Sequence, residues 1–212
     1  MPFTLVGISH SVCTLRPLLV LAEKGVSDFT LHAPNIAAGE HNTESYLKKH
    51  PFGKIPILED NNFVFFESRA ISRFLASEYA EQGTALLPSF DDKKAWAHFE
   101  QWASVEQNNF DPFAQEIFYQ KMVRPMFGQP TEESVLEKAK STLSENLDVF
   151  NDILAKQDYM GGDAFSLIDI FYMPLVGKLF EIQEGNLFGT RHNVQAWWER
   201  VSARDSWKKL VA

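Results

Sequence analysis

The N-terminal part of the chain shows strand-like and helix-like hydrophobic patterns in turn. Residues 3–8 are apolar and β-favouring, and a polar stretch at 9–11 leads into a helical apolar pattern that ends at Gly25. Residues 29–33 then form a second strand pattern. The order strand, helix, strand is typical of a parallel strand pair with a crossover helix.

A proline inside the helical pattern constrains where that helix begins. Proline is tolerated in the first turn of a helix, whereas in the interior it removes a backbone hydrogen bond and its ring clashes with the preceding turn. The position of Pro17 therefore predicts that the helix begins near Cys13 or Thr14.

The next segment predicts a hairpin followed by a helix. Short apolar runs lie before and after the Asp-Asn-Asn turn at residues 60–62, the second of them at 63–66. Ser68 precedes apolar residues at helical spacing, so we expect it to be the N-cap of a helix. Residues 80–88 are polar with Gly and Pro, which is typical of a linker.

Beyond the linker the pattern is helical throughout. One helix begins around Trp96 and should kink or end at Pro112. A long helix with one buried stripe is indicated by apolar residues spaced 3, 4, 4, 3 and 4 apart, namely Leu136, Ala139, Leu143, Leu147, Phe150 and Leu154. Ser166 with Asp169 three positions later predicts a capping box, and Trp197 lies on a final helix.

Composition and charge narrow the class of protein. A chain of 212 residues with 45% hydrophobic residues, 18 Phe and 5 Trp has enough apolar material for two compact domains. The net charge of -8 and the lack of a Lys/Arg run argue against a nucleic-acid partner. With Cys13 as its single cysteine and no secretory leader or long apolar run, the chain is expected to be a cytoplasmic protein without disulfides or a membrane span.

Four motifs, in this order and spacing, make the chain resemble the glutathione transferase superfamily, and within it the phi class of plants and fungi. They are Gly-Glu-His at 39–41, Pro-Phe-Gly-Lys-Ile-Pro-Ile-Leu-Glu-Asp at 51–60, Phe-Glu-Ser-Arg-Ala-Ile at 66–71, and the box at 165–169. The resemblance implies an α/β thioredoxin-like N-terminal domain at 1–80, a linker at 81–90 and an all-α C-terminal domain at 91–212. It also implies glutathione as co-substrate, without a metal.

The resemblance also implies which residues hold glutathione. Ile55 before a cis Pro56 would pair its backbone with the cysteinyl unit, as an added strand does. Glu67 would take the γ-glutamyl ammonium group, and Ser68 at a helix N-terminus would take the carboxylate, although Ser68 could simply cap its helix.

The glycyl carboxylate would meet Lys54 and His41, which taken alone read as a solvated lysine and a surface histidine. The family often has a lysine directly after the histidine, and this chain has Asn42 there. One positive charge at the glycyl end is therefore expected to be missing.

The chemistry requires a thiolate, because a thiol of pKa about 8.5 is only about 3% ionised at pH 7. Ser11 matches the catalytic serine of the family and would donate a hydrogen bond to the sulfur. Ser9 is the competing candidate, and as isolated residues both would more often belong to a loop or a cap.

Cys13 supports an alternative function. Ser-Val-Cys at 11–13 is similar to the Ser-Ser-Cys of zeta-class enzymes, which isomerise maleylacetoacetate, so a cysteine-dependent thiol transferase or isomerase is the second hypothesis. Val12 and the Gly-Glu-His motif argue against it, and a lone cysteine near an apolar helix is more often a packing residue. A non-catalytic carrier of hydrophobic ligands is the third hypothesis.

The second substrate is expected to be a small hydrophobic electrophile, with peroxidase activity as a further possibility and detoxification as the role. Its site would lie between the domains and be lined by Phe110, Phe113, Ile117, Phe118 and Met122, each of which could instead be helix core. The resemblance also implies a homodimer with Phe52 at the interface.

Overall fold

A computed structural model describes residues 3–61 and 63–211 of the chain. The chain forms two compact units, the first comprising Met1–Leu87 with Asp205–Ala212 and the second Pro88–Arg204. The sequence-based boundaries at 80 and 90, and the assignment of a function to each part, stay predictions.

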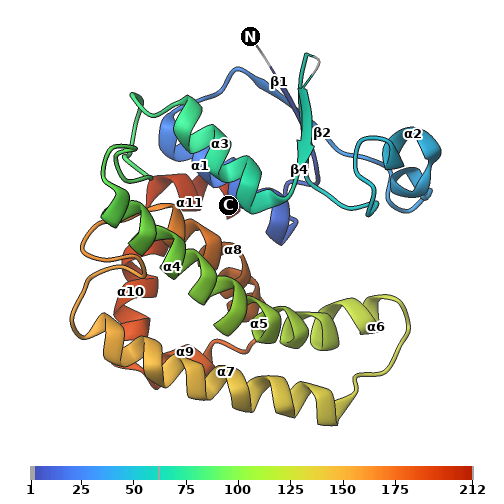
Figure 1. Ribbon diagram of the computed structural model, residues 1–212. Helices are drawn as coiled ribbons and strands as arrows, with labels where there is room; N and C mark the ends of the chain where they lie inside the picture. The colour runs from blue at the N-terminus through green and yellow to red at the C-terminus, as the bar shows by residue number, and fades with distance from the viewer. Residues whose placement is uncertain (1–2, 62, 212) are drawn as a thin grey trace. The chain divides into compact units, whose positions relative to one another are not determined.

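The first unit contains a four-stranded mixed sheet (Figure 1). Its strands are β1 (Phe3–Val6), β2 (Phe29–His32), β3 (Ile57–Asp60) and β4 (Phe63–Phe66), in the order β2-β1-β3-β4. β1 and β2 are parallel, whereas β3 is antiparallel to both β1 and β4. This confirms the predicted crossover and hairpin, and it is a thioredoxin-like arrangement. Asn62 of the predicted turn lies outside the described residues.

Helices cover the two faces of this sheet unequally. On one side α1 (Val12–Lys24) packs against α3 (Ser68–Glu78) and α11 (Asp205–Val211), and α3 also contacts β3 and β4. The short η1 (Glu40–Asn42) and α2 (Glu44–Leu47) lie on the other side. Among the described residues of this unit, the longer helices therefore pack on one face of the sheet.

Helices α1 and α3 begin at residues slightly different from those that the sequence predicts. Helix α1 begins at Val12, with Ser11 as its N-cap, and Pro17 lies in its interior. The helix tolerates the lost backbone bond because it is buried from Thr14 to Leu21. The prediction that Ser68 caps α3 is wrong, since Glu67 is the N-cap and Ser68 is the first helical residue.

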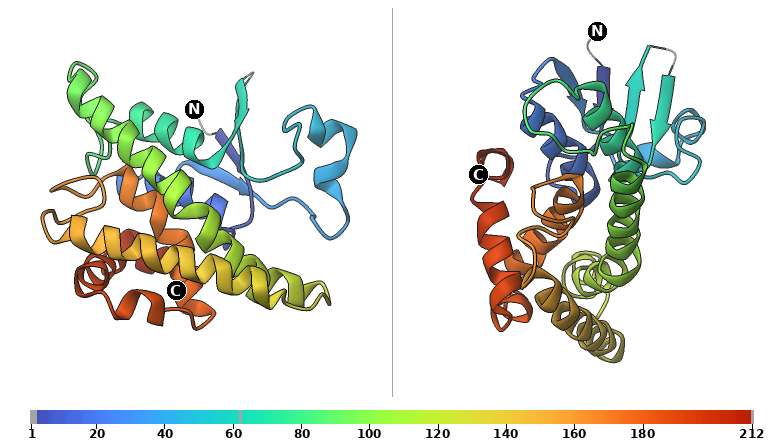
Figure 2. Two further views of the ribbon diagram at one scale, coloured as in Figure 1. Left: turned by 60° about the horizontal axis from the view of Figure 1, so that its bottom comes forward. Right: turned by 60° about the vertical axis from the view of Figure 1, so that its left-hand side comes forward.

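The second unit is helical, as Figures 1 and 2 show. Its elements are α4 (Lys93–Asn109), α5 (Asp111–Phe118), the π-helical η2 (Tyr119–Val123), α6 (Arg124–Met126), α7 (Glu133–Leu154), α8 (Leu167–Glu181), α9 (Asn186–Gly189) and α10 (His192–Ser202). Helix α8 is buried over most of its length and packs against α4, α5 and α10. The predicted stripe of α7 is buried, and α4 ends just before Pro112, as expected.

The predicted capping box is present and extends into the core. Asp169 is fully buried, and its carboxylate accepts hydrogen bonds from the backbone N–H groups of Met160 and Ser166, both at 2.9 Å, and from Trp197 Nε1 at 2.8 Å. Burial raises the pKa of Asp169, although these hydrogen bonds oppose the shift. The box therefore joins the preceding loop, α8 and α10.

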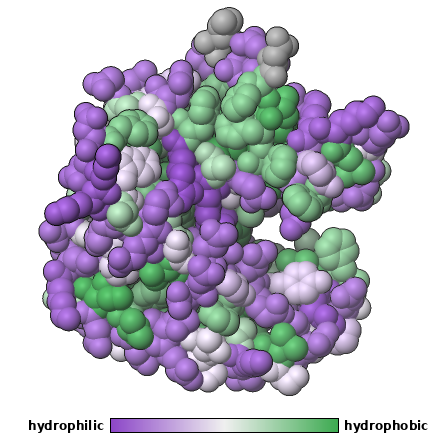
Figure 3. Space-filling view, in the orientation of Figure 1, coloured by the Kyte–Doolittle hydropathy of each residue, from purple (hydrophilic) through white to green (hydrophobic). Residues whose placement is uncertain are grey.

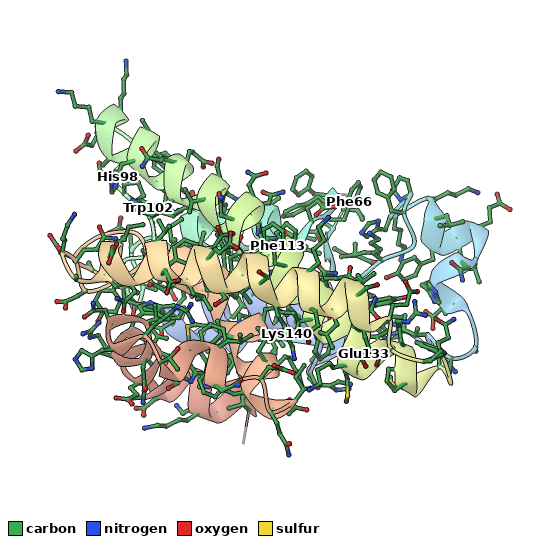
Figure 4. All side chains as sticks on the ribbon, turned by 90° about the horizontal axis from the view of Figure 1, so that it is seen from below. Phe66, His98, Trp102, Phe113, Glu133 and Lys140 are labelled. Carbon is green, nitrogen blue, oxygen red and sulfur yellow. The ribbon has the colours of Figure 1, made fainter. Side chains whose placement is uncertain are left out.

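A second buried carboxylate ties the α5–η2 segment to α7 and the loop after α8. Glu184 lies 2.5 Å from Lys121 Nζ and 2.9 Å from Lys140 Nζ, the latter residue being labelled in Figure 4. Burial alone would raise the pKa of Glu184, but the hydrogen bonds and charges of the two lysines lower it overall. Within the described residues, no helix is long and apolar enough to cross a membrane.

Candidate functional site

The loop after β1 brings Ser11 to the N-terminus of α1. The Ser11 N–H donates to Ile8 O at 2.9 Å, and the residue has the extended backbone of an N-cap. Among the described residues, no N–H of α1 donates to the Ser11 side chain, which is half-buried. A Cβ on Gly7 would lie 2.6 Å from Thr14 Oγ1, so this loop can approach α1 only with glycine there. The competing Ser9 is exposed in a turn.

Arg16 links the N-termini of α1 and α3. Its guanidinium is buried, and Nη1 lies 3.4 Å from Ser68 Oγ and 3.7 Å from Cys13 Sγ. Cys13 itself is half-buried in the first turn of α1. A buried guanidinium and the free N–H groups of two helix starts make this region favourable for an anion.

The turn into α3 has a strained backbone. Glu67 has φ 76° and ψ 110°, in a region that non-glycine residues rarely adopt, and its side chain is exposed. Such a conformation costs about 1 to 3 kcal/mol and persists where the surrounding structure determines it. Ser68 follows with its side chain buried against Arg16. Strain of this kind is concentrated at functional sites.

The segment before β3 also matches the expected geometry. The Ile55–Pro56 peptide bond is cis. Tyr46 donates from its hydroxyl to Lys54 O at 2.8 Å, and the half-buried Ile55 packs against the cluster of Val6, Tyr46 and Ile57. Burial raises the pKa of Tyr46 to about 12, with the nearby carboxylates adding to the effect. The Lys54 side chain is exposed beside this anchored backbone.

His41 and Asn42 lie on η1, next to the same turn. Asn42 Nδ2 is 3.2 Å from His41 Nε2, while Nδ1 of His41 is enclosed and has no hydrogen-bond partner in the described part of the chain. Gly53 has φ 58°, and a Cβ there would lie 2.8 Å from His41 O. Glycine at this position therefore permits the turn carrying Lys54 to approach η1.

The residues expected to line the electrophile site divide into two groups. Phe110 and Ile117 are 1% and 0% exposed, and the Phe110 ring packs at 4.8 Å from that of Tyr172. Both residues therefore lie in the core of the helical unit, which favours the alternative interpretation of them as helix core. Phe113, labelled in Figure 4, and Phe118 are half-buried, and Met122 is exposed.

Phe52 and β4 form an exposed apolar surface on the first unit. Phe52 is 70% exposed, and Phe63 and Val64 on β4 are also exposed. Figure 3 shows apolar residues gathered over β4 and α3. An apolar surface on an edge strand favours association with another protein surface.

One cavity of about 260 Å³ lies elsewhere in the first unit. It is lined by Thr4, Val6, His32, Glu40, Thr43, Ser45, Tyr46, Lys49 and Glu59, so its described lining includes none of the predicted site residues. Among the described residues, no cluster of His, Cys, Asp and Glu is arranged to hold a metal ion.

Two residues of this region were missed in the sequence. Arg16 could have been found, since a charge within the apolar stretch 15–21 indicates a specific buried partner. His50, which is buried and stacked on Phe66, gave no local signal because it lies in the loop before β3 and its partner lies at the end of β4.

Comparisons with known proteins agree with this geometry. Residues 1–77 match the model of the glutathione S-transferase N-terminal domain, and residues 113–205 match that of the C-terminal domain. A glutathione S-transferase of Hyoscyamus muticus is 34% identical over 97% of this chain and 95% of that protein. Glutathione S-transferase 3 of Zea mays is 38% identical over 100% of this chain and 94% of that protein.

A solved structure extends the agreement to three dimensions. Glutathione transferase F7 of Populus trichocarpa superimposes with a TM-score of 0.93, at 32% identity, over 99% of this chain and 97% of that one. The fold is therefore shared over nearly the whole chain. The chain belongs to the glutathione S-transferase family of enzymes, and it resembles the plant phi-class members of that family.

Proposed function

We propose that the chain activates glutathione through the Ser11 hydroxyl and conjugates it to small hydrophobic electrophiles. The observation that carries this is the position of Ser11 as N-cap of α1, with a side chain that forms no capping bond to its helix among the described residues. A hydroxyl in this position can donate to an incoming thiolate, and the helix N-terminus favours the negative charge.

A hydroxyl hydrogen bond and a helix N-terminus together supply enough free energy to lower the pKa of the glutathione thiol. Lowering a thiol pKa by about two units requires about 2.7 kcal/mol of preferential stabilisation of the thiolate. A hydrogen bond to a charged group supplies about 1.5 to 3 kcal/mol, and a helix N-terminus about 0.3 to 1 kcal/mol. The thiol proton leaves to solvent, and the thiolate sulfur then forms a bond to the electrophilic carbon as the leaving group departs with its electron pair.

Glutathione would be held along its length by the strained turn, the cis-proline segment and η1. The γ-glutamyl carboxylate suits the start of α3 at Ser68, beside the buried charge of Arg16, and the ammonium group suits Glu67. Ile55 offers its backbone to the cysteinyl unit, and Lys54 with His41 takes the glycyl carboxylate. Phe113, Phe118 and Met122 supply apolar surface for the electrophile. The proposal includes a peroxidase activity, in which organic hydroperoxides bind in place of the electrophile.

The proposal also covers the oligomeric state, the compartment and the role of the protein. The exposed apolar surface of Phe52 and β4 supports a homodimer. We also propose a detoxifying role in the cytoplasm; a single cysteine, which can form no intrachain disulfide, fits a reducing compartment.

The test is the turnover of a general aromatic electrophile by Ser11→Ala. A loss of two units of pKa lowering predicts a fall in kcat/KM of about 25-fold at pH 7, where the thiolate fraction drops from about 76% to about 3%, with glutathione affinity retained. Ser9→Ala is the matched control and should turn over like the parent protein. Unchanged turnover in Ser11→Ala would refute the role of this serine.

Cys13 supports a second candidate function, thiol exchange, because a guanidinium nitrogen of Arg16 lies 3.7 Å from its sulfur. Incubation with oxidised glutathione should then give a mixed disulfide at Cys13, detected by mass spectrometry and absent in Cys13→Ser. If no adduct forms, thiol exchange at this residue is excluded.

A further inference from the structure

His50 is a buried residue that connects the end of α2 to the turn leading to the cis-proline. It is 2% exposed. Its N–H donates to Tyr46 O at 2.9 Å, its carbonyl accepts from the Gly53 N–H at 2.9 Å, and its ring Nδ1 accepts from the Phe52 N–H at 3.4 Å. The side chain and backbone of this one residue therefore define the turn that presents Lys54.

The ring also contacts the strand end that precedes the strained turn. It stacks on Phe66 with centroids 4.3 Å apart and an interplanar angle of 25°, and Phe66 is the residue directly before Glu67. The Phe52 ring lies edge-on to both, at 6.2 Å from His50 and 6.3 Å from Phe66. Phe66 is labelled in Figure 4. His50 thus contacts two of the segments to which the proposed glutathione-binding residues belong, the Lys54–Ile55 turn and the strand end before Glu67.

We propose that His50, as a neutral imidazole, is a positioning residue for glutathione binding and makes that binding sensitive to pH. Its hydrogen bond sets the turn that carries Lys54 and Ile55, and its stacking sets the strand end that carries Glu67. The two segments are thereby held at the spacing that one tripeptide requires. The inference rests on the proposed function, since glutathione is taken as the ligand.

The hydrogen bond fixes the protonation state that the proposal needs. Nδ1 can accept the Phe52 N–H only when it carries no proton, so the proton of the neutral ring is on Nε2. Burial lowers the pKa of His50 below its ordinary 6.5, and of the charged groups near it Glu67 opposes this shift and Lys54 adds to it. Tyr46 on α2 stays neutral, because its pKa is raised to about 12.

Proton uptake would remove the acceptor and place a charge against Phe66 and Phe52. The turn would then lose its side-chain anchor, and the two glutathione-binding segments would no longer be held together. Because the same backbone groups bind glutathione in the ground state and in the transition state, the effect falls on KM for glutathione and leaves kcat largely unchanged.

Two substitutions separate the hydrogen bond from the stacking. His50→Phe keeps an aromatic ring and removes the acceptor, whereas His50→Asn keeps an acceptor oxygen and removes the ring. His192→Asn, at an exposed position of α10, is the matched control. Steady-state kinetics with glutathione and a general aromatic electrophile are measured from about pH 5 to about pH 8, the range over which a histidine titrates.

The expected result is a split between kinetic constants. His50→Phe should raise KM for glutathione about fivefold at neutral pH, as expected for one lost hydrogen bond, with kcat and KM for the electrophile unchanged. In the parent protein KM for glutathione should rise as the pH falls, and both His50 variants should lack this rise. A lower melting temperature with unchanged KM would show a purely structural role and overturn the proposal, as would a parental pH profile in both variants.

Amide hydrogen exchange in the protein without ligand tests the positioning separately from catalysis. Exchange of the Phe52 amide should be faster in His50→Phe than in the parent protein and unchanged in His192→Asn; equal rates would refute the anchoring role whatever the activity. If the parent protein neither binds glutathione nor turns over the electrophile, the proposed function itself fails, and the binding role of His50 with it.

Discussion

Replacing Asp169 should destabilise the helical unit more than any comparable surface change. Asp169→Ala leaves three donors without their acceptor, the buried N–H of Met160 and Nε1 of Trp197 and the partly buried N–H of Ser166. Each such loss costs about 1 to 3 kcal/mol, so the sum is about 3 to 9 kcal/mol. This is a large share of the 5 to 15 kcal/mol that typically stabilises a folded protein.

A graded series makes the estimate refutable. Asp169→Asn can keep the oxygen shared by Met160 and Trp197 but turns an amide NH₂ toward the Ser166 N–H, so it should cost about 2 to 4 kcal/mol. Urea unfolding, monitored by far-UV circular dichroism, measures the free energy of unfolding of both Asp169 variants. Asp152→Ala, at an exposed position, is the control and should change this free energy by less than about 0.5 kcal/mol. The reasoning is refuted if Asp169→Ala costs under about 1.5 kcal/mol or if the Asn variant is the less stable of the two.

Two further changes test charge and backbone conformation. Glu184→Gln should cost about 3 kcal/mol at neutral pH, because its lysine partners lose a buried anion. Because the pKa of Glu184 is lowered in the folded protein, its contribution to stability is complete at pH values above its ordinary pKa of 4.5. This contribution is lost as the pH falls through the lower pKa of the folded state, so the urea midpoints of parent and variant should converge in acid. Gly83→Ala should destabilise by at least about 2 kcal/mol in thermal unfolding, because its φ is 57° and the new Cβ would lie 2.1 Å from Glu23 O. Gly128→Ala, with a similar φ but open space around it, should cost less.

Sequence patterns predicted the elements because each pattern reports burial along a single segment. The stripe of α7, the end of α4 before Pro112 and the box at Ser166 are all determined by residues within a few turns of one another. Helix α1 begins at Val12, one residue before the predicted Cys13, so Pro17 lies deeper in the helix than its local geometry favours. Burial of the whole helix outweighed that local cost.

The site was less accessible to such reasoning, because its geometry depends on contacts between distant segments. The motif residues were found through resemblance. That the N-cap of α3 is Glu67 and not Ser68 depends on the backbone conformation of Glu67, which no residue pattern predicts. Phe110 and Phe113 have the same residue type and lie on the same helical stretch, yet one is core and the other half-buried. Only the direction in which each side chain points separates them.

Under the proposed function, the glycyl carboxylate of glutathione lies beside η1 and the turn that carries Lys54, where the chain has Asn42. Asn42 is uncharged and its Nδ2 lies 3.2 Å from Nε2 of His41, so in this proposal Lys54 supplies the positive charge for the carboxylate. The other nitrogen of His41 is enclosed, so the ring can reach a carboxylate only through the nitrogen that Asn42 already contacts. An asparagine amide can share a carboxylate with a neighbouring histidine through hydrogen bonds but adds no charge. We therefore propose that recognition of the glycyl carboxylate depends more on the position of the Lys54 turn than on net charge, and that the anchoring of that turn by Tyr46 and His50 sets how this end of glutathione is bound.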